Sequence, residues 1–98
     1  MKTESEQQLL MLSAQIQQWI RDYLAGCCTR AEMADWAVHQ LKLIPPQQLE
    51  QSEYGELLDY VLCRFSDDDW IDESEYRDEM QDLLARLQRA DLGEVVLP

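Results

Sequence analysis

Residues 53–65 read EYGELLDYVLCRF and carry the clearest periodic pattern of the chain. Large apolar side chains recur there at steps of three and four residues, the spacing that places them on one face of an α-helix. They are Tyr54, Leu57, Leu58, Val61, Leu62 and Phe65. The pattern predicts a helix over 53–65 with one buried face, and we expect Cys63 to be a core residue as well. Gly55 falls in the first turn, where the destabilising effect of glycine is smallest.

Three other segments show the same periodicity. They predict helices from about Glu6 to Ala25, from about Thr29 to Lys42 and from about Glu73 to Ala90. Their apolar stripes are, in chain order, Leu9, Leu12, Ile16, Trp19, Ile20, Tyr23 and Leu24; then Met33, Ala37, Val38, Leu41 and Ile44; and finally Tyr76, Met80, Leu83, Leu84 and Leu87. Residues 47–52 form a polar connector with room for a short helical turn.

Several local signals predict where the helices begin and end. Residues 29–32, Thr-Arg-Ala-Glu, have the spacing of a capping box, in which the hydroxyl and the carboxylate each accept a hydrogen bond from a free amide N–H, and residues 72–75 give a second start of this kind. Ser5 is expected to cap the first helix, and Gly26 to follow its end in the left-handed conformation. Pro45-Pro46 ends the second helix, because proline disfavours a helical residue before it and has no N–H to donate.

The composition agrees with a helical fold. Gly and Pro number three each, and hydrophobic residues make up 46% of the 98-residue chain, too many for a disordered acidic tail. We therefore predict an all-α fold, a small single-domain four-helix bundle over residues 1–98, with 1–5 and 93–98 as flexible ends. Its core is predicted to pack Leu58, Val61, Leu62, Phe65, Met80, Leu83, Leu84 and Leu87 against Ile16, Trp19, Met33, Val38 and Leu41.

Acidic residues are concentrated in the second half of the chain. Residues 1–49 contain four Lys/Arg and five Asp/Glu, whereas residues 50–98 contain four Arg and 15 Asp/Glu, so the two halves carry −1 and −11. Such a surface repels nucleic acid and anionic membranes, and it attracts basic protein surfaces. We predict a partner-binding surface formed by Asp67, Asp68, Asp69, Trp70, Asp72, Glu73, Glu75, Asp78, Glu79 and Asp82.

Trp70 stands inside this acidic stretch. A large aromatic side chain flanked by carboxylates is a common form of protein-binding hot spot. The alternative is that Trp70 only fastens the loop onto the bundle, as an apolar residue close to a helix start often does.

Residues 67–72 also raise a calcium hypothesis, because hard cations prefer clustered carboxylates. The spacing does not fit an EF-hand, since a loop that starts at Asp67 places Ile71 at a ligand position and lacks the glycine of the turn. A solvated acidic loop before a helix fits the residues better. We therefore expect no metal and no other cofactor.

Other candidate reactive groups are sparse. Asp35 and the single histidine, His39, stand four residues apart, which fits a hydrogen-bonded surface pair better than a metal site. Three cysteines without C-x-x-C spacing argue against a disulfide framework and a zinc site, and we interpret Cys27 and Cys28 as loop thiols, with a redox role as the alternative. No catalytic constellation or glycine-rich phosphate loop is present, so we predict that the protein is not an enzyme.

The N-terminal residues are polar, and no run of about 20 apolar residues occurs anywhere in the chain. The sequence thus shows neither a signal peptide nor a membrane-spanning segment. We expect a cytoplasmic location.

Residues 24–37 read LAGCCTRAEMADWA and contain the pattern Leu-x-Gly-x-x-Thr-Arg-x-Glu-x-x-x-Trp-Ala. This pattern resembles a motif of small, acidic, largely uncharacterised bacterial helical proteins, some of which are grouped with immunity-type proteins. A looser likeness extends to residues 57–59, 69–76 and 83. The motif consists mainly of capping and packing positions, so the resemblance implies a helical fold and a bacterial origin and carries no catalytic residue.

Charge needed only for solubility can be spread evenly over a surface, whereas here it is clustered. We therefore expect a non-enzymatic acidic protein-binding module whose partner is a protein with a basic surface, for example an immunity or inhibitor protein that covers a basic toxin or nuclease. The alternative is a structural or assembly subunit whose acidity serves solubility alone. A carboxylate metal-binding or enzymatic domain is a third hypothesis, with no motif to support it.

Overall fold

The computed structural model describes residues 4–67 and 72–93. Over these ranges the chain forms helices and no strand. The elements are α1 (Glu4–Leu24), α2 (Arg30–Leu43), α3 (Pro46–Glu50), α4 (Glu53–Phe65) and α5 (Glu73–Asp91). The prediction of a small all-α domain is confirmed, and the short α3 joins the four long helices where we expected a polar connector.

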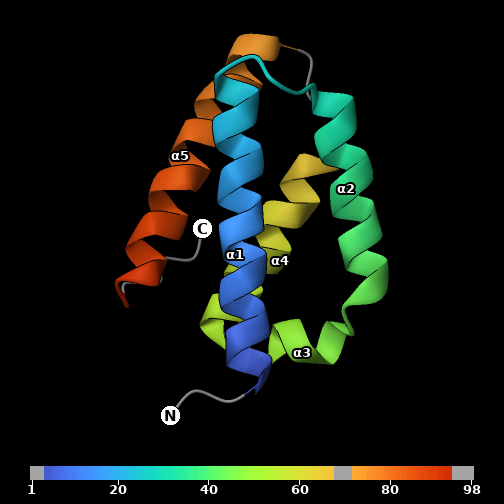
Figure 1. Cartoon of the computed structure of the whole chain (residues 1–98), viewed down its shortest axis with the longest axis vertical. Helices are drawn as coiled ribbons and strands as arrows, with labels where there is room; N and C mark the ends of the chain where they lie inside the picture. The colour runs from blue at the N-terminus through green and yellow to red at the C-terminus, as the bar shows by residue number, and fades with distance from the viewer. Residues whose placement is uncertain (1–3, 68–71, 94–98) are drawn as a thin grey trace.

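Helix α4 is the centre of the bundle (Figure 1). It packs against α1, α2 and α3, and α1 packs in addition against α5. Figure 1 shows α1 and α5 side by side and running in opposite directions, with α4 behind α1 and α2. Because α4 has neighbours on several sides, its apolar stripe is fully enclosed, and Leu58, Val61 and Leu62 have no exposed surface.

The predicted core is largely confirmed, with corrections at its margin. Trp19, Leu41 and Leu84 are partly buried against the core, while Val38 is 40% exposed. Val38 was predicted wrongly because α2 buries Met33 and Ala37, and the residue after Ala37 lies about 100° further round the helix. Cys63 was also predicted wrongly, since it is exposed on α4 beside the buried Leu62.

The predicted helix boundaries hold except at the first helix start. The capping box of α2 is formed, with Thr29 Oγ1 accepting from the Glu32 N–H at 3.2 Å and Glu32 Oε1 accepting from the Thr29 N–H at 3.1 Å. Asp72 caps α5 by accepting from the Ser74 N–H at 2.9 Å. The structure describes α1 from Glu4 onwards, and the predicted capping side chain of Ser5 lies outside what it describes.

Gly26 ends α1 as predicted. Its φ of 81° lies in the left-handed region, and the turn is closed by hydrogen bonds from the N–H of Cys27 to the Asp22 carbonyl and from the N–H of Gly26 to the Tyr23 carbonyl. This pair of bonds is the Schellman motif, which satisfies carbonyl groups that the helix end would otherwise leave without partners. The turn brings α2 back alongside the bundle.

Gly55 has a packing role that its place in the first turn of α4 did not reveal. A Cβ atom at this position would overlap the carbonyl oxygen of Leu49 and lie 2.9 Å from the carbonyl carbon. Leu49 is the buried residue of α3. Glycine therefore allows the backbones of α3 and α4 to approach closely, and Ser52 starts α4 by accepting from the Gly55 N–H at 3.1 Å.

Candidate functional site

The predicted acidic surface is divided by the structure into groups with different contacts. Asp68, Asp69 and Trp70 lie outside the described residues, and their place in a binding surface stays a prediction. The other seven predicted residues lie at the end of the α4–α5 connection and along the first half of α5: Asp67, Asp72, Glu73, Glu75, Asp78, Glu79 and Asp82. Their exposure and partners decide which of them are available to another protein.

Arg64 on α4 pairs with two of these carboxylates. Its Nη1 donates to Asp67 Oδ2 at 3.1 Å, and its Nε lies 3.5 Å from Glu79 Oε1. All three side chains are only about a quarter exposed. Asp67 and Glu79 thus serve to join α4 to α5, and Arg64 offsets one of their two negative charges.

Glu73 belongs to a second cluster, formed where α1, α2 and α5 meet, although its own side chain stays 67% exposed. The hydroxyl of Tyr23 donates to Glu73 Oε1 at 2.7 Å, and Arg30 Nη1 lies 3.9 Å from Glu73 Oε2. The guanidinium of Arg30 also stacks over the ring of Tyr76, with its central carbon 4.5 Å from the ring centroid. Burial, together with the hydrogen bond to Glu73, raises the pKa of Tyr23 to about 12.

This second cluster explains the arginine of the sequence motif over residues 24–37. Arg30 directly follows the Thr29 cap, and its side chain reaches α5 from the start of α2. Arg77 of α5 also joins this helix to α1, because its Nη2 donates to the Leu24 carbonyl oxygen at 2.6 Å. Thr29 and Arg30 of this segment thus contribute to capping and to helix packing.

The remaining acids form one exposed surface, which we call the acidic flank: Glu75, Asp78 and Asp82. These residues are spaced three and four apart on α5, so they share a face of the helix. All three are exposed, and Glu75 and Asp78 make no hydrogen bond or ion pair to any other described residue. Asp82 accepts from Arg86 Nε at 2.9 Å while its side chain stays 55% exposed.

A partly buried polar network at the opposite end of α5 was missed in the sequence. The carboxylate of Asp91 accepts from Gln17 Nε2 at 2.8 Å, from the Tyr54 hydroxyl at 2.9 Å and from Ser13 Oγ at 3.4 Å. Ser13 and Gln17 are buried within the α1 interface, at 0% and 5% exposure. The sequence signal for this network was the position of Ser13 and Gln17 on the apolar side of α1, because a polar side chain there requires a hydrogen-bond partner.

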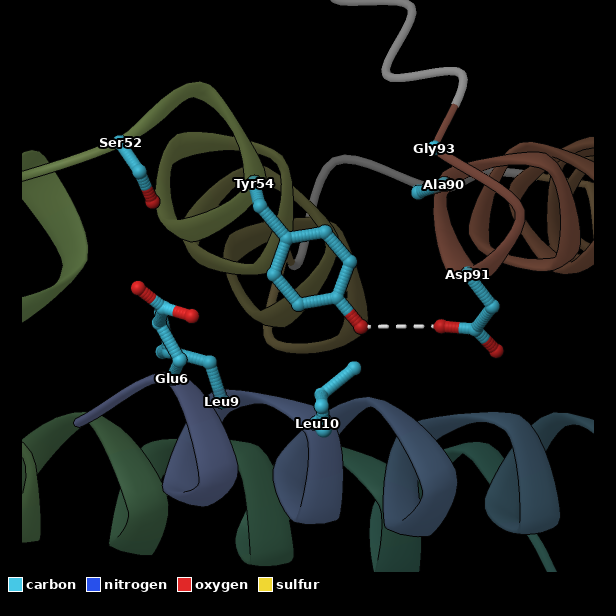
Figure 2. A pocket seen from close by; sticks show the side chains of 8 residues that line it. All are labelled: Glu6, Leu9, Leu10, Ser52, Tyr54, Ala90, Asp91 and Gly93. Carbon is cyan, nitrogen blue, oxygen red and sulfur yellow. Dashed lines mark hydrogen bonds between the residues drawn. The ribbon is translucent and has the colours of Figure 1, made fainter. Parts of the chain in front are cut away.

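A hollow of about 320 Å³ opens beside this network (Figure 2). In Figure 2 the ring of Tyr54 projects from α4 with its hydroxyl directed at Asp91 on α5, and Leu9 and Leu10 of α1 lie below. Burial, together with the hydrogen bond to Asp91, raises the pKa of Tyr54 to about 12. Since the Asp91 carboxylate already accepts from three donors, its role is to join α1, α4 and α5.

Two of the three thiols, those of Cys28 and Cys63, are in surroundings that lower their reactivity. Cys28 is partly buried and donates to the Trp19 carbonyl oxygen at 3.7 Å, while Cys27 and Cys63 are exposed. Burial raises the pKa of Cys28, and burial with the nearby Asp59 raises the pKa of Cys63. Because the thiolate is the reactive form, both shifts lower reactivity.

The Asp35–His39 pair is not formed, and the calcium hypothesis for residues 67–72 falls largely on residues 68–71, outside the described chain. Asp35 and His39 both lie on the surface, but no hydrogen bond links these two described side chains. Within residues 4–67 and 72–93, no group of three or more His, Cys, Asp or Glu side chains is arranged to hold a metal ion. In the same part of the chain, no helix combines the length and apolar character needed to cross a membrane.

Comparisons of the chain with protein-family models, with curated proteins and with solved structures found no significant match.

Proposed function

We propose that this protein is a non-enzymatic protein-binding module that uses the acidic flank of α5 to bind a protein with a basic surface. The observation that carries the proposal is that Glu75, Asp78 and Asp82 share one exposed helix face, of which only Asp82 has an arginine partner among the described residues, Arg86. Carboxylates that face water on a rigid helix supply a fixed field for attracting a cationic partner.

The net charge of −12 favours a protein partner over other macromolecules. Nucleic acid and anionic membranes carry the same sign of charge and are repelled, whereas a protein with Lys and Arg at its active cleft is attracted. Toxins and nucleases that bind phosphate groups have such clefts. An immunity or inhibitor protein that covers one of them is the specific role we propose, in keeping with the motif resemblance at residues 24–37.

The alternative is an assembly subunit whose acidity serves solubility alone. The ion pairs of Arg64 with Asp67 and Glu79 favour it in part, because they show that some of the clustered acids hold helices together. Under this alternative the position of the remaining charges would not matter, and only their total would.

Two double variants with the same change in net charge separate these functions. Glu75→Lys with Asp78→Lys reverses the acidic flank, and Asp35→Lys with Glu50→Lys reverses two exposed acids elsewhere on the surface. The partner is first captured from the source organism on immobilised wild-type protein, and its association rate with each variant is then measured by surface plasmon resonance. Circular dichroism confirms that each variant is folded.

We expect the flank variant to associate about tenfold more slowly at low salt, because electrostatic steering raises association rates by 10-fold or more. The control variant should keep an association rate close to that of the wild type. Equal slowing in both variants would show that net charge alone matters, and unchanged binding in both would remove the acidic flank from the proposal.

A further inference from the structure

The surface formed by α1 and α2 differs in character from the rest of the molecule. Two adjoining shallow hollows of about 240 and 180 Å³ lie along it, and both are lined by Gln15 of α1. The first continues to Gln40 and Ile44 of α2, and the second continues along α1 to Trp19. Figure 1 shows α1 and α2 in front of α4.

Neutral polar and apolar groups make up almost all of this surface. We call it the α1–α2 face and define it by the hollow-lining residues Gln8, Met11, Gln15, Gln18, Trp19, Gln40 and Ile44, together with Leu43 from its position on α2. Among the described residues that line the two hollows, Asp22 is the only charged one, and it already accepts from Gln18 Nε2 at 2.9 Å. In a chain with 20 Asp and Glu, such a surface is unusual.

Large apolar side chains on this face are exposed to water. Met11 is 64% exposed and Leu43 is 62% exposed. Leu43 is placed on this face by its spacing, since it follows Trp36 by seven residues and Gln40 by three. Trp36 in turn stacks against Trp19 of α1 with ring centroids 5.7 Å apart. The face therefore combines a packed aromatic pair with two exposed apolar side chains.

We propose that the α1–α2 face binds a second copy of this chain and forms a two-fold symmetric dimer. In such an interface each surface patch meets itself, so its groups must be compatible with copies of themselves. A carboxylate fails this condition, because like charges placed together repel. A glutamine meets it, because the amide is both a donor and an acceptor, and apolar side chains such as Met11 and Leu43 meet it as well.

A glutamine pair of the required kind already exists within one protomer. Gln48 Nε2 donates to Gln8 Oε1 at 2.7 Å, joining α3 to α1 at the edge of the face. Each protomer carries −12, so two copies can approach only where the local charge is small. The acidic flank of α5 is excluded from self-association by this condition, which leaves it open for the basic partner proposed above.

Sedimentation equilibrium of the full chain measures the oligomeric state directly. We expect a species of twice the protomer mass of 11.5 kDa. Because the two copies repel each other over long range, the dimer should become tighter as salt is raised from about 0.05 M to about 0.5 M. Binding of a basic partner to the acidic flank should change with salt in the opposite direction, so the two surfaces are distinguished by the sign of the salt effect.

Charges introduced on the face should break the dimer. Met11→Glu and Leu43→Glu each place a carboxylate opposite its own copy, and we expect each to raise the dimer dissociation constant at least tenfold. Val38→Glu is the matched control, because Val38 is an exposed apolar residue on another side of α2 and should leave the dimer unchanged. Circular dichroism confirms the fold of each variant.

Two results would overturn the proposal. A wild-type protein that stays monomeric at about 0.1 mM in high salt does not use the face for self-association. A dimer that persists unchanged in both Met11→Glu and Leu43→Glu uses a different surface.

Discussion

At the scale of single residues, Thr29 has the most clearly defined structural role. Its hydroxyl accepts from the Glu32 N–H, and the Glu32 carboxylate accepts in return from the Thr29 N–H. Thr29→Ala removes one half of this box, and we expect it to lower the free energy of unfolding by about 1 kcal/mol. Urea denaturation followed by circular dichroism measures the change. Thr29→Ser keeps the hydroxyl and should stay close to the wild type, so equal losses in both variants would contradict the capping role.

The buried tyrosines give a residue-scale prediction for alkaline pH. The pKa values of Tyr23 and Tyr54 rise from 10.0 to about 12 on folding. The neutral form is therefore favoured in the folded state, so the stabilisation is complete below pH 10 and is lost as pH rises towards about 12. We expect the urea concentration at the midpoint of unfolding to decrease as pH is raised from about 9 to about 11, and to decrease less in Tyr54→Phe. A midpoint that is constant over this range would show that these hydroxyls are not held in the protonated form.

At the scale of elements, α4 carries the core. Leu62 has no exposed surface, whereas the next residue, Cys63, is exposed on the same helix. Leu62→Ala should lower the free energy of unfolding by about 2–5 kcal/mol, because it leaves a cavity in the core around α4 that cannot fully close. Cys63→Ala should change it by less than about 0.5 kcal/mol. Similar effects at both positions, measured by urea denaturation, would mean that the side of α4 with Leu62 is not the side packed into the core.

The elements also show how far the sequence predicts this fold. The helix at 53–65 has the predicted bounds, and the capping box at 29–32 is formed, because both depend on residues close together in the chain. The roles of Gly55 and Gln17 were not predictable in this way. Gly55 matters through its approach to the Leu49 backbone, and Gln17 through Asp91, 74 residues away, and neither contact leaves a periodic signal in the sequence.

The same limit applies to the candidate site. The sequence locates the clustered acids but not their partners, and Arg64 had no visible relation to Glu79 before α4 and α5 were placed side by side. Charge that seemed to form one continuous surface is divided into internal ion pairs and an exposed acidic flank. Pairing between distant helices is decided by tertiary packing, which residue counts do not contain.

At the scale of the whole molecule, the account assigns two surfaces of opposite character to two tasks. The neutral α1–α2 face is proposed for self-association, and the acidic flank of α5 is proposed for binding a basic protein. With a net charge of −12, long-range attraction to a basic protein should speed its approach, and added salt should screen that attraction.

The most direct test of the binding role is the association rate of the captured partner, measured by stopped-flow fluorescence as salt is raised from about 0.05 M to about 0.5 M. The account predicts that the rate for the wild type falls at least tenfold over this range, and that the rate for Glu75→Lys with Asp78→Lys starts lower and falls less. An association rate that does not depend on salt, and is the same in the wild type and the variant, would contradict it.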